Sequence, residues 1–207
     1  MPGKTHHTQA GFTQMYAGNP PWDIGKPQAA FIEVADEIVG PLLDAGCGTG
    51  NVSVFFAARG LEVTGIDFVE EAIRRGEAKA AERGLSVRFL VKDAMTLEVW
   101  DERFASVIDS GLFHIYSGEE RTQYVRGLAH VLRVGGRLFL LGFSDEEPAA
   151  EGGISVQELE QEFAEGWEVE SVRTVRAEVS AAFLAEFPKD FPEAGPKMRF
   201  AIIRRTA

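Results

Sequence analysis

The sequence predicts an α/β fold, a Rossmann-like three-layer α/β/α sandwich built on a seven-stranded sheet. Short apolar runs alternate with amphipathic helical patterns along most of the 207 residues, which favours parallel strands joined by helices. A glycine-rich turn at 46–50 links the first strand to a helix. The last two strands have no helical pattern between them, and we expect them to form a final hairpin-like pair. The chain is of a size typical of one domain with a substantial core.

Residues 1–26 are rich in Gly, Pro and aromatic residues and show no clear periodicity. Two prolines stiffen the entry to Trp22, and Gly25 permits a turn. Irregular segments of this kind often cover ligands, so we predict that this N-terminal arm forms a lid, with packing of Trp22 on the core as the alternative. A helix is expected over 27–39, where apolar residues form one stripe.

The glycine-rich turn follows the first strand, expected over 41–46, and precedes a helix over 50–59. Glycines allow a sharp turn and a close approach of the backbone to a ligand, and the helix N-terminus adds free N–H groups. A dinucleotide-binding fingerprint would need its third glycine at position 51, where this chain has Asn51. Cys47 is interpreted as a small core residue, because no partner base is evident.

The second strand, expected over 61–66, ends at Asp67. This acid lies about twenty residues after Gly46, the offset at which Rossmann-like folds bind a ribose through a carboxylate. The alternative is an N-cap for the helix expected over 69–83. Both roles are compatible with one side chain.

The remaining elements follow the same alternation of apolar strands and amphipathic helices. A capping box at Ser155 and Glu158 predicts the start of one helix. The residues 180–196 form an apolar, Pro-broken insert that we expect either to wall a substrate pocket or to pack on the sheet edge. The expected strands are 86–91, 104–108, 137–143, 167–179 and 198–205, with a helix over 118–132.

Composition excludes several classes of function. The net charge is −11 and no basic stripe is present, which disfavours nucleic-acid binding. No apolar run approaches the roughly 18 residues of a membrane helix, and the first residues lack the apolar core of a signal peptide. We therefore expect a cytoplasmic protein without a membrane partner. With four histidines and one cysteine, no metal-ligand spacing is convincing, so no metal site is predicted.

These residues together give the chain a resemblance to the class I S-adenosylmethionine (SAM)-dependent methyltransferases over nearly its whole length. The pattern from Asp44 to Gly50 resembles their motif I. The segment 21–28 resembles the N-terminal signature of thiopurine and halide methyltransferase-like enzymes, and 107–114 resembles the strand-four motif of heterocyclic toxin methyltransferases. The resemblance implies the strand order 3-2-1-4-5-7-6 with strand seven antiparallel.

The resemblance also implies SAM as cofactor, S-adenosylhomocysteine as product, and a small acceptor with a heteroaromatic or phenolic hydroxyl, a thiol or a nitrogen. The backbone near Gly46 and Gly48 should meet the amino-acid portion of SAM, Asp67 the ribose, and Asp93 the adenine. The full set of expected cofactor contacts is Trp22, Asp44, Gly46, Cys47, Gly48, Gly50, Asn51, Asp67, Phe68, Asp93, Ala94, Asp109 and Ser110.

Methyl transfer needs positioning and a dry site more than it needs proton chemistry. Trp22 is the candidate for an aromatic face near the sulfonium cation. Asp109 and Ser110 follow the fourth strand, where acceptors bind in such folds, so Asp109 is expected to position the acceptor. His114 is the candidate general base, since an imidazole titrates near neutrality. A structural histidine is the alternative.

Other classes of function remain open at this point. A SAM-sensing module would bind the cofactor without turnover, and an NAD(P)-dependent oxidoreductase is disfavoured by Asn51. Asp109 is followed by Ser110 and Gly111 rather than the Pro-Pro pattern of amino-methylating enzymes of DNA and protein, which weakens a macromolecular substrate. The sequence leaves open a monomer or a homodimer.

Overall fold

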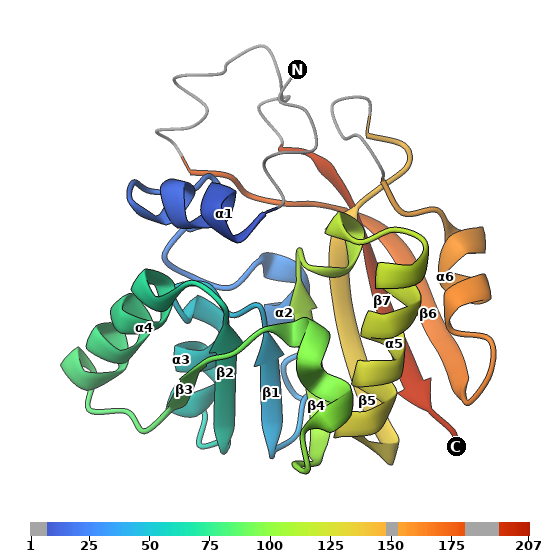
Figure 1. Cartoon of the computed structure of the whole chain (residues 1–207), viewed down its shortest axis with the longest axis horizontal. Helices are drawn as coiled ribbons and strands as arrows, with labels where there is room; N and C mark the ends of the chain where they lie inside the picture. The colour runs from blue at the N-terminus through green and yellow to red at the C-terminus, as the bar shows by residue number, and fades with distance from the viewer. Residues whose placement is uncertain (1–7, 148–152, 181–194) are drawn as a thin grey trace.

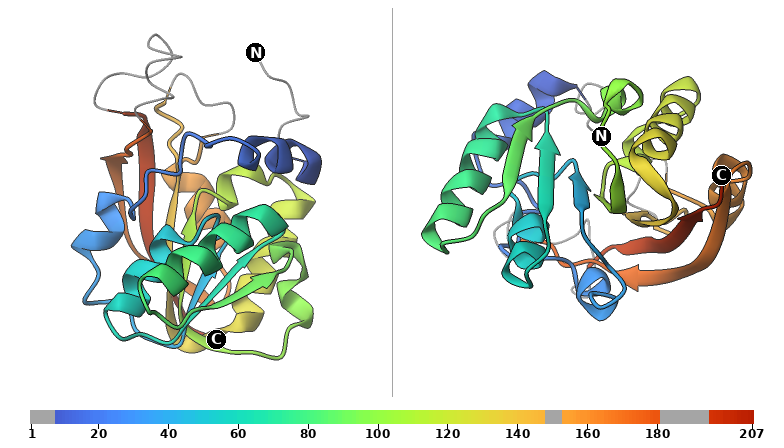
Figure 2. Two further views of the ribbon diagram at one scale, coloured as in Figure 1. Left: turned by 90° about the vertical axis from the view of Figure 1, so that its left-hand side faces the viewer. Right: turned by 90° about the horizontal axis from the view of Figure 1, so that it is seen from below.

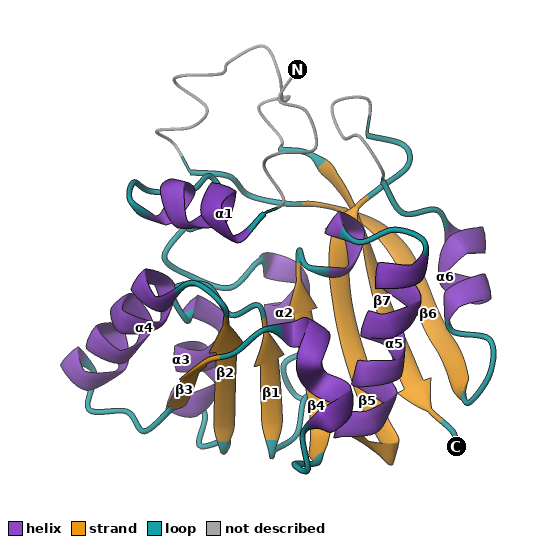
Figure 3. Cartoon of the chain, viewed as in Figure 1, coloured by secondary structure: helices purple, strands orange, loops and turns teal. Residues whose placement is uncertain are grey.

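The computed structural model describes residues 8–147, 153–180 and 195–207. Seven strands form one sheet in the order β3-β2-β1-β4-β5-β7-β6, as predicted (Figures 1 and 3). The strands are β1 Leu42–Ala45, β2 Val63–Asp67, β3 Arg88–Val91, β4 Phe104–Ser110, β5 Leu132–Phe143, β6 Trp167–Arg176 and β7 Lys197–Arg205. The helices are α1 Gln9–Tyr16, α2 Ala29–Glu33, α3 Asn51–Ala58, α4 Glu70–Glu82, α5 Glu119–Val131 and α6 Val156–Glu162, with 3-10 turns η2 Ala94–Val99 and η3 Phe113–Ile115.

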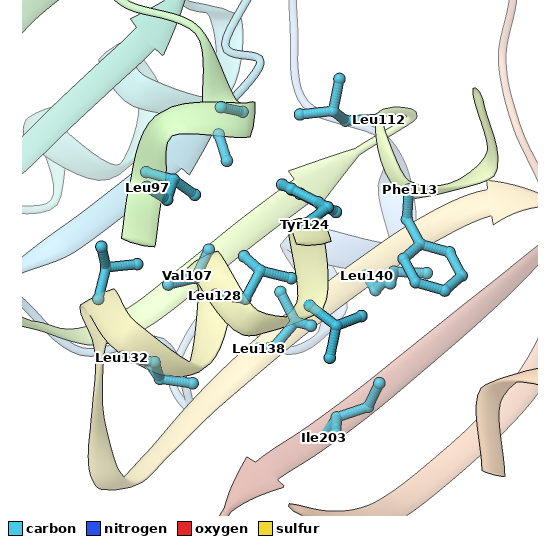
Figure 4. Close-up of a cluster of buried hydrophobic side chains, with 14 of the residues drawn as sticks. Leu97, Val107, Leu112, Phe113, Tyr124, Leu128, Leu132, Leu138, Leu140 and Ile203 are labelled. Carbon is cyan, nitrogen blue, oxygen red and sulfur yellow. The ribbon is translucent and has the colours of Figure 1, made fainter. Parts of the chain in front are cut away.

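The first five strands pair in parallel, whereas β7 is antiparallel to both β5 and β6. Alternate residues along the central strands enter opposite cores. On β4, Val107 packs with η2, α5 and α6, while its neighbour Ile108 packs with α2 and α3. Helices therefore cover both faces of the sheet (Figure 2). Figure 4 shows the first of these cores, around Tyr124 and Leu128 of α5.

Two segments near the N-terminus differ from the sequence-based expectation. The helix expected over 27–39 ends at Glu33, and turns with bonds such as Ala35 N to Ile32 O continue the chain. Its apolar stripe is nevertheless largely buried. Conversely, the arm contains α1, which was not expected. Thr8 caps α1, and Tyr16 at its end packs on Val69 and Ala72 of the β2–α4 region, so tertiary contacts stabilise a helix too short to be stable alone.

The C-terminal half follows the prediction closely, apart from the ends of two strands. The capping box predicted at α6 is present, since Ser155 Oγ accepts from Glu158 N at 3.1 Å and Ser155 N donates to Glu158 Oε2 at 2.9 Å. The strand β5 begins at Leu132 instead of residue 137, and β6 ends at Arg176 instead of residue 179. Residues 181–194, which make up most of the predicted insert 180–196, lie outside the described residues. Within the described residues, no helix combines the length and apolarity needed to cross a bilayer.

Candidate functional site

The glycine loop, residues 46–50, connects β1 to α3 at the carboxyl edge of the sheet. Gly46, Gly48 and Gly50 all have positive φ, of 69°, 53° and 73°. At Gly48 a side chain is excluded by space as well as by φ, because a Cβ would lie 2.6 Å from the Tyr16 hydroxyl. The sequence signal at this loop therefore reflects a backbone conformation that only glycine adopts readily.

Asp67 lies at the end of β2 and joins the glycine loop to the start of α4. Its Oδ2 accepts the backbone N–H of Gly48 at 3.0 Å, and its Oδ1 accepts that of Val69 at 2.9 Å. Desolvation raises the pKa of this buried carboxyl, while the two backbone bonds oppose the rise. Each oxygen accepts more than one hydrogen bond, so Asp67 has capacity for a ligand's hydroxyl groups in addition to its structural bonds.

Asp44, the last acid before the glycine loop, is almost completely buried on β1. It accepts the Ser53 hydroxyl of α3 at 2.6 Å. Burial raises its pKa to about 7, with the Ser53 bond opposing the rise. A buried carboxyl group is therefore held at the wall of the site.

The N-terminal arm lies across the glycine loop, as Figure 1 indicates by the place of α1 beyond the carboxyl ends of β1 and β2. Asp23 accepts the Thr49 hydroxyl at 2.9 Å and the Asn51 side-chain amide at 2.7 Å. The Trp22 indole donates to the Tyr16 hydroxyl at 3.1 Å. Trp22 retains 40% exposure, which places it at the rim of the site.

The end of the arm, just before α2, is held by residues that follow β6. Gln28 Nε2 donates to Glu178 O at 2.9 Å, and Glu178 N donates to Gln28 Oε1 at 2.8 Å. Lys26 forms an ion pair with the Glu178 carboxylate at 2.8 Å, and Ser180 N donates to Pro21 O. Segments far apart in the sequence thus close one cavity.

The cavity has a volume of about 320 Å³, within the usual range for small-molecule sites. One half is bounded by the glycine loop, Asp44, Asp67 and Phe68. The other half is bounded by what we call the apolar wall, which gathers apolar side chains from η3, β5, the segment that follows β6, and β7. The apolar wall consists of Ile115, Leu141, Phe143, Ala177, Val179 and Met198.

His114 lies in the second half of the cavity, on η3 just beyond β4. Its ring meets Phe143 edge to face, with centroids 4.9 Å apart. Ser110, at the end of β4, also lines the cavity. An imidazole at an apolar surface fits proton abstraction from a bound acceptor and also fits packing.

Asp109 is not among the residues that line the cavity. Its Oδ1 accepts Leu112 N at 2.8 Å, and its Oδ2 accepts Phe113 N and the Tyr124 hydroxyl, each at 2.9 Å. Desolvation raises the pKa of this fully buried carboxyl to about 6. The geometry favours a structural role, in which Asp109 holds η3 and α5 against β4. The Phe113 ring is likewise in the core.

The structure thus brings together most of the predicted cofactor contacts. Trp22, Asp44, Gly46, Cys47, Gly48, Asn51, Asp67, Phe68 and Ser110 all line the cavity. Gly50, Asp93, Ala94 and Asp109 do not line it. Asp93 caps η2 by accepting Met95 N at 2.9 Å, and Gly50 packs behind the loop, where a Cβ would lie 2.5 Å from Phe89.

Several cavity residues were not identified from the sequence. Tyr16 and Asp23 belong to the arm, in which the sequence pattern singles out only Trp22. Phe143 and Met198 come from distant strands that look like ordinary core segments. Among the described residues, no cluster of three or more His, Cys, Asp or Glu side chains forms a metal-binding group.

Comparisons with known proteins point to one class. Residues 42–136 match a family described as a methyltransferase domain. The chain is 32% identical over 170 residues to 2-heptyl-1-hydroxyquinolin-4(1H)-one methyltransferase of Mycobacteroides abscessus, covering 79% of this chain and 75% of that protein. It is 31% identical to probable thiol methyltransferase 2 of Arabidopsis thaliana, covering 70% and 67% of the two chains. A structure reported for the conversion of a disulfide bond into a thioacetal group during echinomycin biosynthesis superposes with a TM-score of 0.82 at 32% identity, covering 96% of this chain and 93% of that one.

Proposed function

This chain belongs to the class I SAM-dependent methyltransferases of the small-molecule type, and from that premise we propose that it methylates an oxygen or sulfur atom on a flat, largely apolar acceptor. The observation that carries the proposal is the two-part cavity. The half bounded by the glycine loop suits the cofactor, and the half bounded by the apolar wall and His114 suits a ring. The hydroxyquinolone and thiol methyltransferases among its relatives support the same acceptor classes.

The proposed contacts follow from the residues that line the first half. Backbone groups of Gly46 and Gly48 would meet the amino-acid end of SAM, and the two oxygens of Asp67 would accept the ribose hydroxyls. Trp22 at the rim would face the sulfonium cation. Asp93 and Ala94, which do not line the cavity, remain the proposed neighbours of the adenine. The cofactor supplies a methyl group that is already activated for displacement.

The chain's own contribution is then positioning and exclusion of water. The apolar wall would hold the ring of the acceptor and direct its oxygen or sulfur toward the methyl group, so that attack occurs in line with the leaving sulfur. His114 would take the proton from a hydroxyl acceptor. A thiol that is already ionised would not need this step.

The test is transfer of a labelled methyl group from SAM to a panel of hydroxyquinolines, phenols, thiopurines, aryl thiols and iodide, with S-adenosylhomocysteine release as a common readout. We expect turnover on a heteroaromatic hydroxyl or an aryl thiol. SAM binding without turnover on any of these compounds would contradict the proposed acceptor class and would favour a sensor.

A further inference from the structure

Lys79 is a half-buried lysine of α4 that bonds to the glycine loop and the start of α3. Its Nζ donates to Thr49 Oγ1 at 3.0 Å and also to Asn51 Oδ1. Desolvation lowers the pKa of Lys79, while the nearby Asp23 carboxylate raises it. Lys79 does not line the cavity, so any effect on ligand binding must pass through the residues that it contacts.

Hydrogen-bond direction is fixed throughout this cluster, because an ammonium group only donates and a carboxylate only accepts. Thr49 Oγ1 accepts from Lys79, which leaves its single proton for Asp23 Oδ2 at 2.9 Å. Asn51 presents Oδ1 to Lys79 and therefore presents Nδ2 to Asp23 Oδ1 at 2.7 Å. The two charged groups thus specify the same orientation of both polar side chains.

Asp23 directly follows Trp22, so the cluster helps to fix the part of the arm at the rim of the cavity. We propose that Lys79 is a positioning residue, which directs Thr49 and Asn51 onto Asp23 and thereby holds the N-terminal arm over the cofactor half of the cavity. This inference rests on the proposed function in one respect, namely that the half beside the glycine loop binds the cofactor.

Arg75, also on α4, provides a useful contrast. It donates to the backbone oxygens of Tyr16 and Gly18 at 2.8 and 3.0 Å. These bonds attach the arm to α4 but orient none of the side chains of the glycine loop. The contribution of Lys79 to ligand binding should therefore depend on the presence of Asp23, whereas the contribution of Arg75 should not.

The experiment measures S-adenosylhomocysteine binding by calorimetry and its dissociation rate by stopped flow, in the full chain without acceptor. The variants are Lys79→Met, Asp23→Asn, the double variant and Arg75→Met. Arg74→Met is the matched control for Lys79→Met, because exposed Arg74 pairs with half-buried Glu71 on the same helix. We expect Lys79→Met to weaken binding about tenfold or more, as befits a lost charge-assisted bond. Hydrogen exchange of residues 16–26 should rise in parallel.

The double variant shows whether Lys79 acts by positioning Asp23 or only by supporting the fold, because in the first case the effects of the two substitutions on binding are not additive. In the Asp23→Asn background, Lys79→Met should weaken binding by less than about twofold, whereas Arg75→Met should retain its full effect. Unchanged affinity and exchange in Lys79→Met, or additive effects with Asp23→Asn, would overturn the proposal. Failure of the wild-type chain to bind would instead contradict the cofactor assignment. If Lys79→Met does not fold, Lys79→Gln gives the same comparison.

Discussion

The Asp67 carboxylate accepts the backbone N–H of Gly48 at 3.0 Å, across the gap between the end of β2 and the glycine loop. The same carboxylate accepts Val69 N at the start of α4. One side chain therefore fixes the loop and lines the cavity, and each of its oxygens can accept a further hydrogen bond. The N-cap alternative for Asp67 is wrong, because the N-cap of α4 is Val69 and no side chain caps this helix. The ribose contact stays a prediction.

Replacement of Asp67 tests the ribose contact. Asp67→Ala should weaken SAM binding by about 1.5–3 kcal/mol, the value of charge-assisted hydrogen bonds. Calorimetry gives the affinity, and thermal unfolding shows how much of the change comes from the lost bond to Gly48. Glu77→Ala, an exposed acid on α4, is the control. Unchanged SAM affinity would rule out the ribose assignment.

Asp109 should matter to stability more than to cofactor binding. Asp109→Ala leaves two buried N–H groups and the Tyr124 hydroxyl without their acceptor, which should lower the free energy of unfolding by about 3 kcal/mol or more. Denaturant unfolding measures this loss. A variant of normal stability with a raised KM for acceptor would instead support the acceptor-positioning role expected from the sequence.

His114 should act on some acceptors and not on others. If it removes a proton, His114→Gln should lower kcat for a phenolic acceptor about 10²- to 10⁴-fold, with a much smaller effect on an aryl thiol that is ionised at the assay pH. Comparison of the two acceptors in one variant provides the internal control. Equal losses with both would identify His114 as a packing residue beside Phe143.

Removal of the N-terminal arm tests its role as a lid. Deletion of residues 1–25 takes away Trp22 and the Asp23 bonds to Thr49 and Asn51, so the SAM dissociation rate should rise and turnover should be lost. Stopped-flow dissociation and the methyl-transfer assay provide the two readouts. Trp22→Phe, which keeps an aromatic ring, should retain most of the turnover. Full activity in the truncated chain would show that the arm only packs on the core and does not act as a lid.

Asp44 should make stability depend on pH in a defined direction. Its pKa in the folded state is about 7, above its ordinary value of 3.8, so the folded state binds the proton more tightly than the unfolded state. The resulting stabilisation is present at low pH and is lost as the pH rises toward 7. Relative to Asp44→Asn, the wild-type chain should lose at most about 1.4 kcal/mol per pH unit over this interval. Parallel unfolding curves from pH 4 to 7 would contradict the raised pKa.

The sequence by itself determined the strands, the glycine loop and the place of Asp67 at the end of β2, because these depend on local periodicity and on spacing within one β-α-β unit. The order of the strands was implied by the resemblance to known methyltransferases. The capping box at Ser155 was equally local, since both partners lie within one turn. The short helix α1 escaped prediction because its stability comes from the packing of Tyr16 on a region about fifty residues further along the chain.

Only the tertiary structure decided which residues line each half of the cavity and which are buried behind it. Asp109 resembles a site acid in sequence, yet α5 brings the Tyr124 hydroxyl to it and buries it. The pairing of Asp23 with Thr49 and Asn51, and the meeting of Phe143 with Met198 in the apolar wall, join segments far apart in the chain. Such contacts are set by how helices and strands pack, and a local pattern of residues does not record them.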